Sequence, residues 1–357
     1  MYEEFLGIKP VDPRLRVDAG ALEDYLDRQI GGLQGPLDLT QFKGGQSNPT
    51  YCVSAADGRR FVLRRKPPGP LLPSAHAVDR EYKVLRALHA AGFPVARPYL
   101  LCNEPSVIGT AFYVMEFVEG RVLWDQSLPG MTKAERFSIW NELNRVIAQL
   151  HTIDYRAAGL EDFGKPERYI ERQIARWTAQ YRNSETGRIP AMESLIGWLP
   201  ENIPLQSGAA VVHGDFRLDN VIFHPAEPKI LAVLDWELST LGDPLADFAY
   251  HCMSWHIPSG QFRGIAELDV ASLGIPAERD YIAMYCARTG RDTVQPDVWR
   301  FYLAYNLFRL AAILQGIAKR SIEGTAASDH ARDTGAKAGA MAEIGWGLVK
   351  GMGRRSH

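Results

Sequence analysis

Apolar positions alternate with polar ones over short runs in residues 1–118, and they recur at helical spacing over longer runs after that. Alternation predicts β-strands, whereas a spacing of three and four residues predicts amphipathic helices. The strands expected to form a mainly antiparallel sheet are 37–43, 50–54, 60–65, 97–102 and 110–118. The expected helices are 17–30, 78–91, 132–151, 169–181, 192–199, 276–288, 296–320 and 326–352. The pattern predicts an α+β protein, with a small sheet in residues 1–118 and a mainly helical part in residues 119–357.

One further hairpin is expected inside the helical part, within the stretch VVHGDFRLDNVIFHPAEPKILAVLDWE (211–237). Residues 221–223 and 230–234 are β-branched, apolar or aromatic, as in strands, and the intervening HPAEPK carries two prolines that favour a tight connection. Paired strands lie about 4.8 Å apart, so the residues entering and leaving the hairpin are expected to be neighbours. These are Asn220 and Asp235, and Asp215 lies five residues before Asn220.

Two carboxylates and an amide near one hairpin end suit phosphoryl transfer. Mg²⁺ prefers carboxylate and amide oxygens together with water and phosphate oxygens, and a further acid can accept the proton of an attacking hydroxyl. Residues of these types also cap turns through bonds to the backbone, which is the structural alternative for Asp215 and Asn220. The loop therefore predicts either a kinase-type site or a well-capped turn.

The words HGD-x4-N and LDWE resemble the aminoglycoside phosphotransferase family, which is related to the protein kinases. The resemblance implies a protein-kinase-like bilobal fold that uses ATP and Mg²⁺. It implies that Asp215 is the catalytic base and that Asn220 and Asp235 are the metal ligands. It also implies that Asp247, after the helix start Asp243-Pro244, steadies the catalytic loop, a position that a helix dipole alone would equally favour.

A glycine-containing turn between the first two strands of the sheet is a candidate phosphate-binding loop. Its GGQSNP sequence would let backbone N–H groups approach a nucleotide, although an ordinary hairpin turn is equally compatible with it. The candidate nucleotide-binding residues of this loop are Gly44, Gly45, Ser47 and Asn48.

Arg64 occupies the strand position at which the family resemblance implies a phosphate-binding lysine. A guanidinium is permanently charged and presents a fork that suits phosphate oxygens, so it can fill this role with a different geometry. Arg65 and Lys66 are the alternatives. The resemblance further implies that Glu81, on the following helix, pairs with Arg64, and the alternative for Glu81 is an exposed helix charge.

The strand that ends in MEFVEG is the expected crossing between the two lobes. The resemblance implies that its backbone contacts adenine through residues from Met115 to Val118, with Met115, Glu116 and Val118 as the candidates. Two histidines are assigned structural roles: His213 is expected to tie down backbone, and His151 to lie in the core with its hydrogen bonds satisfied.

Composition is ordinary for a globular protein, with 46% hydrophobic and 23% charged residues. The net charge of −2 predicts no general affinity for nucleic acid or for an anionic membrane. The four cysteines form no CxxC pair, the N-terminus lacks the features of a signal peptide, and no apolar segment is expected to reach about 18 residues. We therefore expect a cytoplasmic protein; the oligomeric state stays open.

The acceptor is expected to be a small-molecule hydroxyl. Between His251 and His330 eight acidic and eight basic residues balance, without the acidic surplus that a polycationic aminoglycoside requires. FVLRRKPPG, LLPSAHAVDREY and HGDFRLDN are similar to the kinase-like domain fused to some acyl-CoA dehydrogenases, which implies a hydroxyacyl compound or its CoA thioester. The alternatives are an aminoglycoside antibiotic and a nucleotide-binding regulatory module without turnover. Aromatic and basic candidates for the acceptor pocket are Trp255, His256, Arg263, Tyr281, Tyr285, Arg288, Trp299 and Arg309.

Overall fold

A computed structural model of the chain describes residues 7–43, 48–69, 76–206, 208–324 and 331–350. The chain divides into two compact units that do not follow a single cut in the sequence. The sheet unit comprises Met1–Trp124, Arg156–Phe163 and Asp219–Ser239. The helical unit comprises Asp125–Tyr155, Gly164–Leu218 and Thr240–His357. Compared with the expected division after residue 118, the sheet unit thus contains two later segments, one of which includes Asn220 and Asp235.

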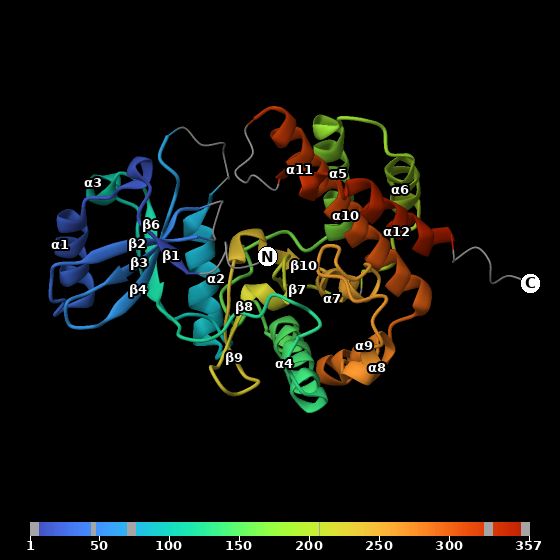
Figure 1. Cartoon of the computed structure of the whole chain (residues 1–357), viewed down its shortest axis with the longest axis horizontal. Helices are drawn as coiled ribbons and strands as arrows, with labels where there is room; N and C mark the ends of the chain where they lie inside the picture. The colour runs from blue at the N-terminus through green and yellow to red at the C-terminus, as the bar shows by residue number, and fades with distance from the viewer. Residues whose placement is uncertain (1–6, 44–47, 70–75, 207, 325–330, 351–357) are drawn as a thin grey trace, which may run out of the picture. The chain divides into compact units, whose positions relative to one another are not determined.

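The sheet unit is built on a six-stranded antiparallel sheet in the order β1-β2-β3-β4-β6-β5 (Figure 1). Its strands are β1 (Ile8–Lys9), β2 (Asp38–Phe42), β3 (Thr50–Ser54), β4 (Arg60–Arg65), β5 (Pro98–Cys102) and β6 (Phe112–Glu116). Its helices are α1 (Ala19–Ile30), α2 (Val78–Ala90) and α3 (Pro105–Ile108). The five predicted strands are confirmed, whereas the short β1 and α3 were not predicted.

Alternation along the strands separates the two faces of this sheet. On one face, apolar residues such as Tyr51, Leu63 and Val114 form a core with Leu22 and Leu26 of α1. The opposite face carries polar side chains toward α2, because successive residues of a strand point to opposite sides. Arg64 and Tyr113, which are direct partners in the β4–β6 register, both contact Glu81 of α2 on that face. The polar face is therefore where the sheet unit concentrates its chemistry.

The predicted hairpin of β8 (Val221–Phe223) and β9 (Ile230–Val233) is present and antiparallel. It belongs to the sheet unit, where the Val233 amide donates to the carbonyl of Pro94 at 2.9 Å. Arg121 pairs with Phe223 through both backbone bonds, and a side chain on Gly120 would collide with the Phe223 carbonyl. This close approach of the two backbones explains why a glycine stands at position 120.

The helical unit surrounds a long central helix, α10 (Pro296–Ile322), which packs against five other helices: α5 (Tyr169–Ser184), α6 (Pro190–Glu201), α7 (Pro244–Cys252), α11 (Ala331–Gly335) and α12 (Ala338–Lys350). The remaining helices are α4 (Lys133–Thr152), α8 (Val270–Leu273) and α9 (Glu278–Thr289). β7 (Ala210–Val212) and β10 (Thr240–Gly242) form a two-stranded antiparallel sheet, and the polar loop follows β7 directly.

Local sequence signals account for the helix starts. The capping box between Thr132 and Glu135 is present at the start of α4, and the Asp243 side chain caps α7 with Pro244 at its first position. The single helix expected over 326–352 is instead two described helices, α11 and α12. Gly335, the last residue of α11, lies so close to Ala318 that no side chain fits there.

α10 corrects the expectation about apolar segments. Among the described residues it is the one helix long and apolar enough, by length and composition, to cross a membrane, with a mean hydropathy of 1.2. Of its most apolar window, 83% is buried inside the protein, as in the core helix of a globular unit. Polar residues such as Asn306 and Arg309 interrupt the apolar segment, and they are themselves buried.

Candidate active site

The β8–β9 hairpin brings Asn220 and Asp235 to the same end, as the sequence predicts. Asn220 directly precedes β8, Asp235 follows β9 after Leu234, and the Leu234 amide donates to the Asn220 carbonyl at 2.8 Å. Asp235 adopts a left-handed backbone conformation, with φ of 63° and ψ of 66°. Such a conformation is uncommon outside glycine, asparagine and aspartate, and here it turns the chain from β9 into the short helix Trp236–Leu238.

Arg64 is the centre of a cluster of charged side chains in the sheet unit, which we call the Arg64 centre. Its Nε lies 2.8 Å from Oε2 of Glu81, so the predicted ion pair is present. Its Nη2 lies 3.3 Å from a carboxylate oxygen of Asp235 and 3.3 Å from one of Glu237. Three carboxylates therefore face one guanidinium, and this local excess of negative charge favours a cation.

The protonation states of this centre follow from burial and charge. Burial by itself lowers the pKa of Arg64, but Glu81, Tyr113, Asp235 and Glu237 raise it overall. Burial raises the pKa of Glu81 against the opposing effects of Arg64 and of hydrogen bonds from Tyr113 and Asn48. The Arg64 ion pair at 2.8 Å and hydrogen bonds from Asn48 at 2.9 Å and Tyr113 at 3.0 Å all favour the ionised form of Glu81 against this effect of burial.

The structure describes one of the four candidate residues of the phosphate loop, Asn48. Gly44, Gly45 and Ser47 lie outside the described residues, and their role stays a prediction. Asn48 is fully buried, with its side-chain amide donating to Glu81 at 2.9 Å and its oxygen 2.9 Å from the His76 ring. The side chain of Asn48 thus holds Glu81 in place, and a contact of Asn48 with a phosphate stays a prediction.

The alternatives to Arg64 have other contacts. Arg65 points to the opposite side of the sheet, where its guanidinium donates to the carbonyls of Ile108 and Leu15 at 3.1 and 3.0 Å. Lys66 lies 3.9 Å from Asp79 near the surface. Of these three basic residues, Arg64 is the one that contacts Glu81, so it keeps the predicted phosphate-binding role.

The predicted adenine-contacting segment begins within β6. Met115 pairs with Val62 and Pro98, and the Glu116 amide donates to the carbonyl of Arg97 at 2.8 Å. Val118 lies beyond the end of the strand. The sheet thus uses the Met115 and Glu116 backbone, and a contact of this segment with adenine stays a prediction.

The polar loop HGDFRLDN is anchored in the helical unit by Asp247. Its carboxylate accepts hydrogen bonds from the backbone amides of His213 at 2.7 Å and Gly214 at 2.8 Å, and it lies 3.1 Å from Nε2 of His151. The other nitrogen of His151 lies 2.7 Å from the Tyr285 hydroxyl, which confirms a buried, satisfied histidine. Burial alone raises the pKa of Asp247, but hydrogen bonding and charge from His151, with help from His213, hold it below its usual range.

Asp215, the predicted base, is held in a defined orientation by the side chains around it. We call this cluster the Asp215 centre. The Tyr250 hydroxyl donates to its Oδ1 at 2.5 Å, and Nε of Arg217 lies 3.2 Å from its Oδ2. Its backbone amide donates to the ring of His213 at 3.1 Å, in agreement with a structural role for that histidine. Arg309 of α10 donates to the Gly214 carbonyl at 2.6 Å and stacks on Tyr250.

The charge around Asp215 keeps it ionised. Burial taken alone raises the pKa of this carboxyl, whereas Arg217, the Tyr250 hydrogen bond, His213 and Arg309 together hold it below its ordinary value. A carboxylate that stays anionic and is aligned by a hydroxyl is ready to accept a proton at neutral pH.

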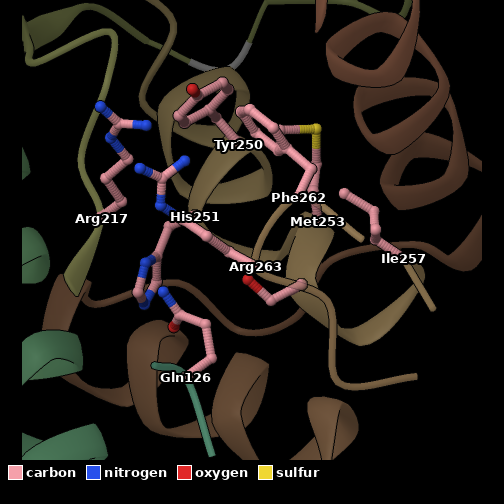
Figure 2. A pocket seen from close by; sticks show the side chains of 9 residues that line it. Gln126, Arg217, Tyr250, His251, Met253, Ile257, Phe262 and Arg263 are labelled. Atoms are coloured by element: carbon pink, nitrogen blue, oxygen red, sulfur yellow. The ribbon is translucent and has the colours of Figure 1, made fainter. Parts of the chain in front are cut away.

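A small pocket of about 20 Å³ lies next to this base in the helical unit (Figure 2). Tyr250 and Arg217, both in contact with Asp215, are part of its wall. The other lining residues are Gln126, His251, Met253, Ser254, Ile257, Phe262 and Arg263. Of the eight residues suggested from the sequence for an acceptor pocket, Arg263 is the one that lines it. Tyr281 and Tyr285 are core residues that stack on Phe248.

Three site residues escaped the sequence analysis: Tyr250, Arg217 and Glu237. Two of them lie in motifs that were recognised, Arg217 within HGDFRLDN and Glu237 within LDWE. Tyr250 lies three residues after Asp247, on the same face of α7. Helical spacing from a recognised aspartate was the available signal for it.

The residues at the hairpin end fit a magnesium ion. Asp235 and Asn220 offer carboxylate and amide oxygens, the hard donors that Mg²⁺ prefers, and the side chain of Asp235 is 36% exposed. Among the described residues no group of three or more His, Cys, Asp or Glu side chains forms a closed metal site. An ion with few protein ligands that keeps several waters, as Mg²⁺ does in phosphoryl-transfer sites, matches this arrangement.

Sequence comparison places the chain among known proteins. A sequence profile of the phosphotransferase enzyme family matches residues 38–296. The chain is 48% identical over 350 residues to mouse acyl-CoA dehydrogenase family member 10, covering 97% of this chain and 32% of that protein. It therefore spans about a third of the length of this relative.

Structural comparison gives the same fold. A Ralstonia eutropha JMP134 protein described as a "putative aminoglycoside phosphotransferase" is 55% identical, with a TM-score of 0.86 over 94% of this chain and 99% of that one. Choline kinase from Cryptosporidium parvum, at 14% identity, has a TM-score of 0.63 over 94% and 97% of the chains. The expected kinase-like fold, an N-terminal antiparallel sheet followed by a mainly helical region, is confirmed.

Proposed function

This chain belongs to the phosphotransferase enzyme family, and from that premise we propose that it is an ATP-dependent kinase acting on a hydroxyl of a small metabolite. The proposed acceptor is a hydroxyacyl compound, free or as its CoA thioester. In the proposal Asp215 is the base, Asn220 and Asp235 hold Mg²⁺, and Arg64 contacts the phosphates of ATP.

The environment of Asp215 is the observation that carries the proposal. An aspartate that only capped a turn would direct its oxygens to nearby backbone amides. Here the two carboxylate oxygens contact the side chains of Tyr250 and Arg217, and both of those residues line a pocket. A carboxylate that is kept anionic beside a cavity supports general base chemistry.

The proposed reaction uses Asp215 at one step. The acceptor hydroxyl forms a bond from its oxygen to the γ-phosphorus of ATP, the bond to the β–γ bridging oxygen breaks, and ADP leaves. The acceptor proton passes to Asp215, which later releases it to solvent. Tyr250 and Arg217 hold the carboxylate in one orientation during this transfer.

The Arg64 centre serves the nucleotide in this proposal. A bound Mg²⁺ would neutralise charge on the phosphate oxygens. Arg64 has a guanidinium fork suited to phosphate, and Glu81 fixes its orientation through a buried ion pair. Asn48 and Tyr113 in turn fix Glu81.

The names of related proteins suggest two acceptor classes. Mouse acyl-CoA dehydrogenase family member 10 is named for chemistry on acyl-CoA compounds, and a kinase region within the same chain would reasonably act on a hydroxylated acyl compound. The description of the R. eutropha protein favours an aminoglycoside instead. We propose the hydroxyacyl class because eight acidic and eight basic residues balance between His251 and His330.

The test is acceptor-dependent ADP release with Mg-ATP, measured against hydroxy acids, their CoA thioesters, choline-like alcohols, sugars and aminoglycosides. Asp215→Asn should lower the turnover of any active acceptor by about a hundred- to ten-thousandfold while ATP binding persists. Asp280→Asn, an exposed carboxylate on α9, is the matched control and should leave turnover unchanged.

Each outcome discriminates. Turnover by Asp215→Asn equal to wild type would remove Asp215 as the base. Activity with aminoglycosides, together with protection of bacteria that express the protein, would replace the hydroxyacyl proposal by the antibiotic one. ATP binding without ADP release in the presence of any acceptor would favour the nucleotide-binding regulatory module without turnover.

A further inference from the structure

A histidine just before α2 extends the hydrogen-bond network of the Arg64 centre. His76 lies in the stretch LLPSAHAVDREY, which also contains Glu81. Its Nδ1 lies 2.9 Å from the side-chain oxygen of Asn48, and the Asn48 side chain is fully buried. His76, Asn48, Glu81 and Arg64 all belong to the sheet unit, so the whole network lies within one compact unit.

Asn48 joins His76 to Glu81 through the two ends of one amide group. Its nitrogen donates to Oε1 of Glu81 at 2.9 Å, and its oxygen faces the ring of His76. Through its other oxygen, Oε2, Glu81 lies 2.8 Å from Nε of Arg64. A chain of three contacts therefore leads from the imidazole of His76 to the guanidinium that the proposed function assigns to the phosphates of ATP.

The orientation of the Asn48 amide determines which nitrogen of His76 carries a proton. Because the amide nitrogen serves Glu81, the amide oxygen is the atom that meets the ring, and an amide oxygen can only accept. Nδ1 of His76 must therefore carry a proton, in the neutral ring and in the charged ring alike. An Asn48 amide turned end over end would place its oxygen against an oxygen of Glu81. The proton on Nδ1 thus selects the amide orientation that holds Glu81.

The backbone of His76 adopts a left-handed conformation, with φ of 57°. Residues other than glycine rarely adopt such values, although histidine and asparagine do so more often than most. The Val78 amide donates to the His76 carbonyl at 2.9 Å, and Ala77, which precedes the first residue of α2, offers this helix no side-chain cap. Uncommon backbone conformations persist where the surrounding structure holds them. The contact between the His76 ring and Asn48 therefore ties down a helix start that has no side-chain cap.

We propose that His76 is a positioning residue for the nucleotide. By fixing the Asn48 amide it keeps Glu81 on Arg64, and it thereby keeps Arg64 in the orientation that phosphate binding requires. His76 acts through Asn48 and not through a contact of its own with the substrate. The inference rests on the proposed function and adds a residue to its nucleotide-binding machinery.

Competition between carboxylates explains why the position of Glu81 matters. Nη2 of Arg64 lies 3.3 Å from both Asp235 and Glu237, whereas Nε is held by Glu81 at 2.8 Å. If Glu81 moved away, the guanidinium would be drawn toward the other two carboxylates, and Asp235 is a proposed ligand of Mg²⁺. Loss of the His76 contact is therefore expected to weaken the binding of Mg-ATP and to leave the binding of the acceptor unchanged.

The experiment separates the hydrogen bond of His76 from its backbone conformation. His76→Gly can adopt the positive φ but lacks the ring, whereas His76→Asn tolerates that φ and retains an N–H that can donate to Asn48. His89→Asn changes an exposed histidine in the last turn of the same helix and is the matched control. Asn48→Ala, alone and combined with His76→Gly, completes a double-mutant cycle.

Four readouts are needed. Calorimetry gives the Kd for Mg-ATP, and ADP release gives the KM for ATP and for the acceptor. Thermal unfolding shows that each variant is folded. ¹⁵N NMR of the His76 ring in the wild type, at a pH at which the ring is neutral, identifies the nitrogen that carries the proton.

His76→Gly should raise the Kd and the KM for ATP about tenfold, because a buried hydrogen bond is lost, and should leave the KM for the acceptor within about twofold. His76→Asn should stay within about threefold of the wild type because it keeps a donor, and His89→Asn should not differ from it. In the Asn48→Ala background, His76→Gly should add less than about twofold to the Kd. The NMR spectrum should place the ring proton on Nδ1.

An unchanged Kd for Mg-ATP in folded His76→Gly would overturn the inference. So would additive effects of His76→Gly and Asn48→Ala, an equal loss in His76→Asn and His76→Gly, or a neutral ring with its proton on Nε2. The NMR measurement uses the wild type alone, so it applies even if a variant does not fold.

Failure of the proposed function is seen separately. If the wild type binds Mg-ATP but releases no ADP with any acceptor, the proposed phosphoryl transfer fails, and the Kd values still decide the inference about His76. If the wild type does not bind Mg-ATP, both the proposed function and the inference are overturned.

Discussion

The Arg64 centre of the sheet unit and the Asp215 centre of the helical unit have opposite balances of charge. At the first, one arginine faces the carboxylates of Glu81, Asp235 and Glu237. At the second, one carboxylate faces Arg217, with Arg309 close enough to lower its pKa. An excess of carboxylates suits the binding of a cation, and an excess of cations keeps a base anionic. The same pair of residue types therefore serves two different chemical tasks.

The two centres also differ in burial, which predicts different consequences for stability. The side chains of Arg64 and Glu81 are 9% and 3% exposed, whereas those of Arg217 and Asp215 are 23% and 16% exposed. Removing one partner of a buried ion pair costs much more than removing one partner of a partly exposed pair.

The largest expected effect is therefore on the stability of Arg64→Ala. It should lose about 3–5 kcal/mol of unfolding free energy, because Glu81 would be left buried without its cation. Arg217→Ala should lose about 1–2 kcal/mol. Urea unfolding at neutral pH measures both, with Arg64→Lys as the control that retains the charge. Equal losses in the two alanine variants would contradict the assigned difference in burial.

Asp247→Asn should have the next largest effect, a loss of about 2–3 kcal/mol at neutral pH. The variant keeps the shape of the side chain but removes its negative charge. That charged carboxylate accepts hydrogen bonds from the His213 and Gly214 amides and lies beside His151. The folded-state pKa of Asp247 is lowered, so its stabilisation is complete above the ordinary carboxyl pKa of 3.8 and is lost as the pH falls through the folded value.

Unfolding free energy measured from pH 3 to pH 7 tests this sign. The wild type should gain stability with rising pH across the acidic end of the range, and Asp247→Asn should gain less. Parallel curves for the two proteins would show that Asp247 contributes nothing to the pH dependence.

Tyr250→Phe sharpens the comparison at the base. Loss of the hydroxyl that donates to Asp215 should reduce kcat about tenfold and should raise the pKa of Asp215 toward its ordinary value. The acidic limb of the kcat/KM profile should therefore move to higher pH. A lower kcat with an unmoved limb would mean that Tyr250 affects turnover without setting the charge of the base. Tyr302→Phe, which removes a comparable buried bond to Asp243, is the matched control.

Glu237→Gln should have the smallest effect. This carboxylate is 30% exposed and adds to the negative charge at the Arg64 centre. Its neutralisation should weaken the apparent affinity for Mg²⁺ about threefold and leave kcat at saturating Mg²⁺ nearly unchanged, since a partly exposed charge acts weakly. Titration of activity with Mg²⁺ measures this. A large fall in kcat at saturating Mg²⁺ would instead place Glu237 among the metal ligands.

The sequence determined the elements of this protein and the hairpin site, because both depend on local pattern. Alternation predicted the five main strands, and the spacing of Asn220 and Asp235 around a short hairpin brought them to one end. The capping box at Thr132 was also visible as a local motif, and the family resemblance implied the loop anchor Asp247. The division of the last expected helix into α11 and α12 was not predicted.

Only the tertiary structure decided which side chains complete each centre. Asn48 contacts Glu81 across 33 residues, and Arg309 reaches Gly214 across 95, distances in sequence over which no local pattern exists. Arg64 and Arg65 are adjacent and chemically identical, yet pleating sends one to Glu81 and the other to Ile108. The composition of a site depends on such convergences, and that is why the residues that line the pocket beside Asp215 could be recognised only after the chain was folded.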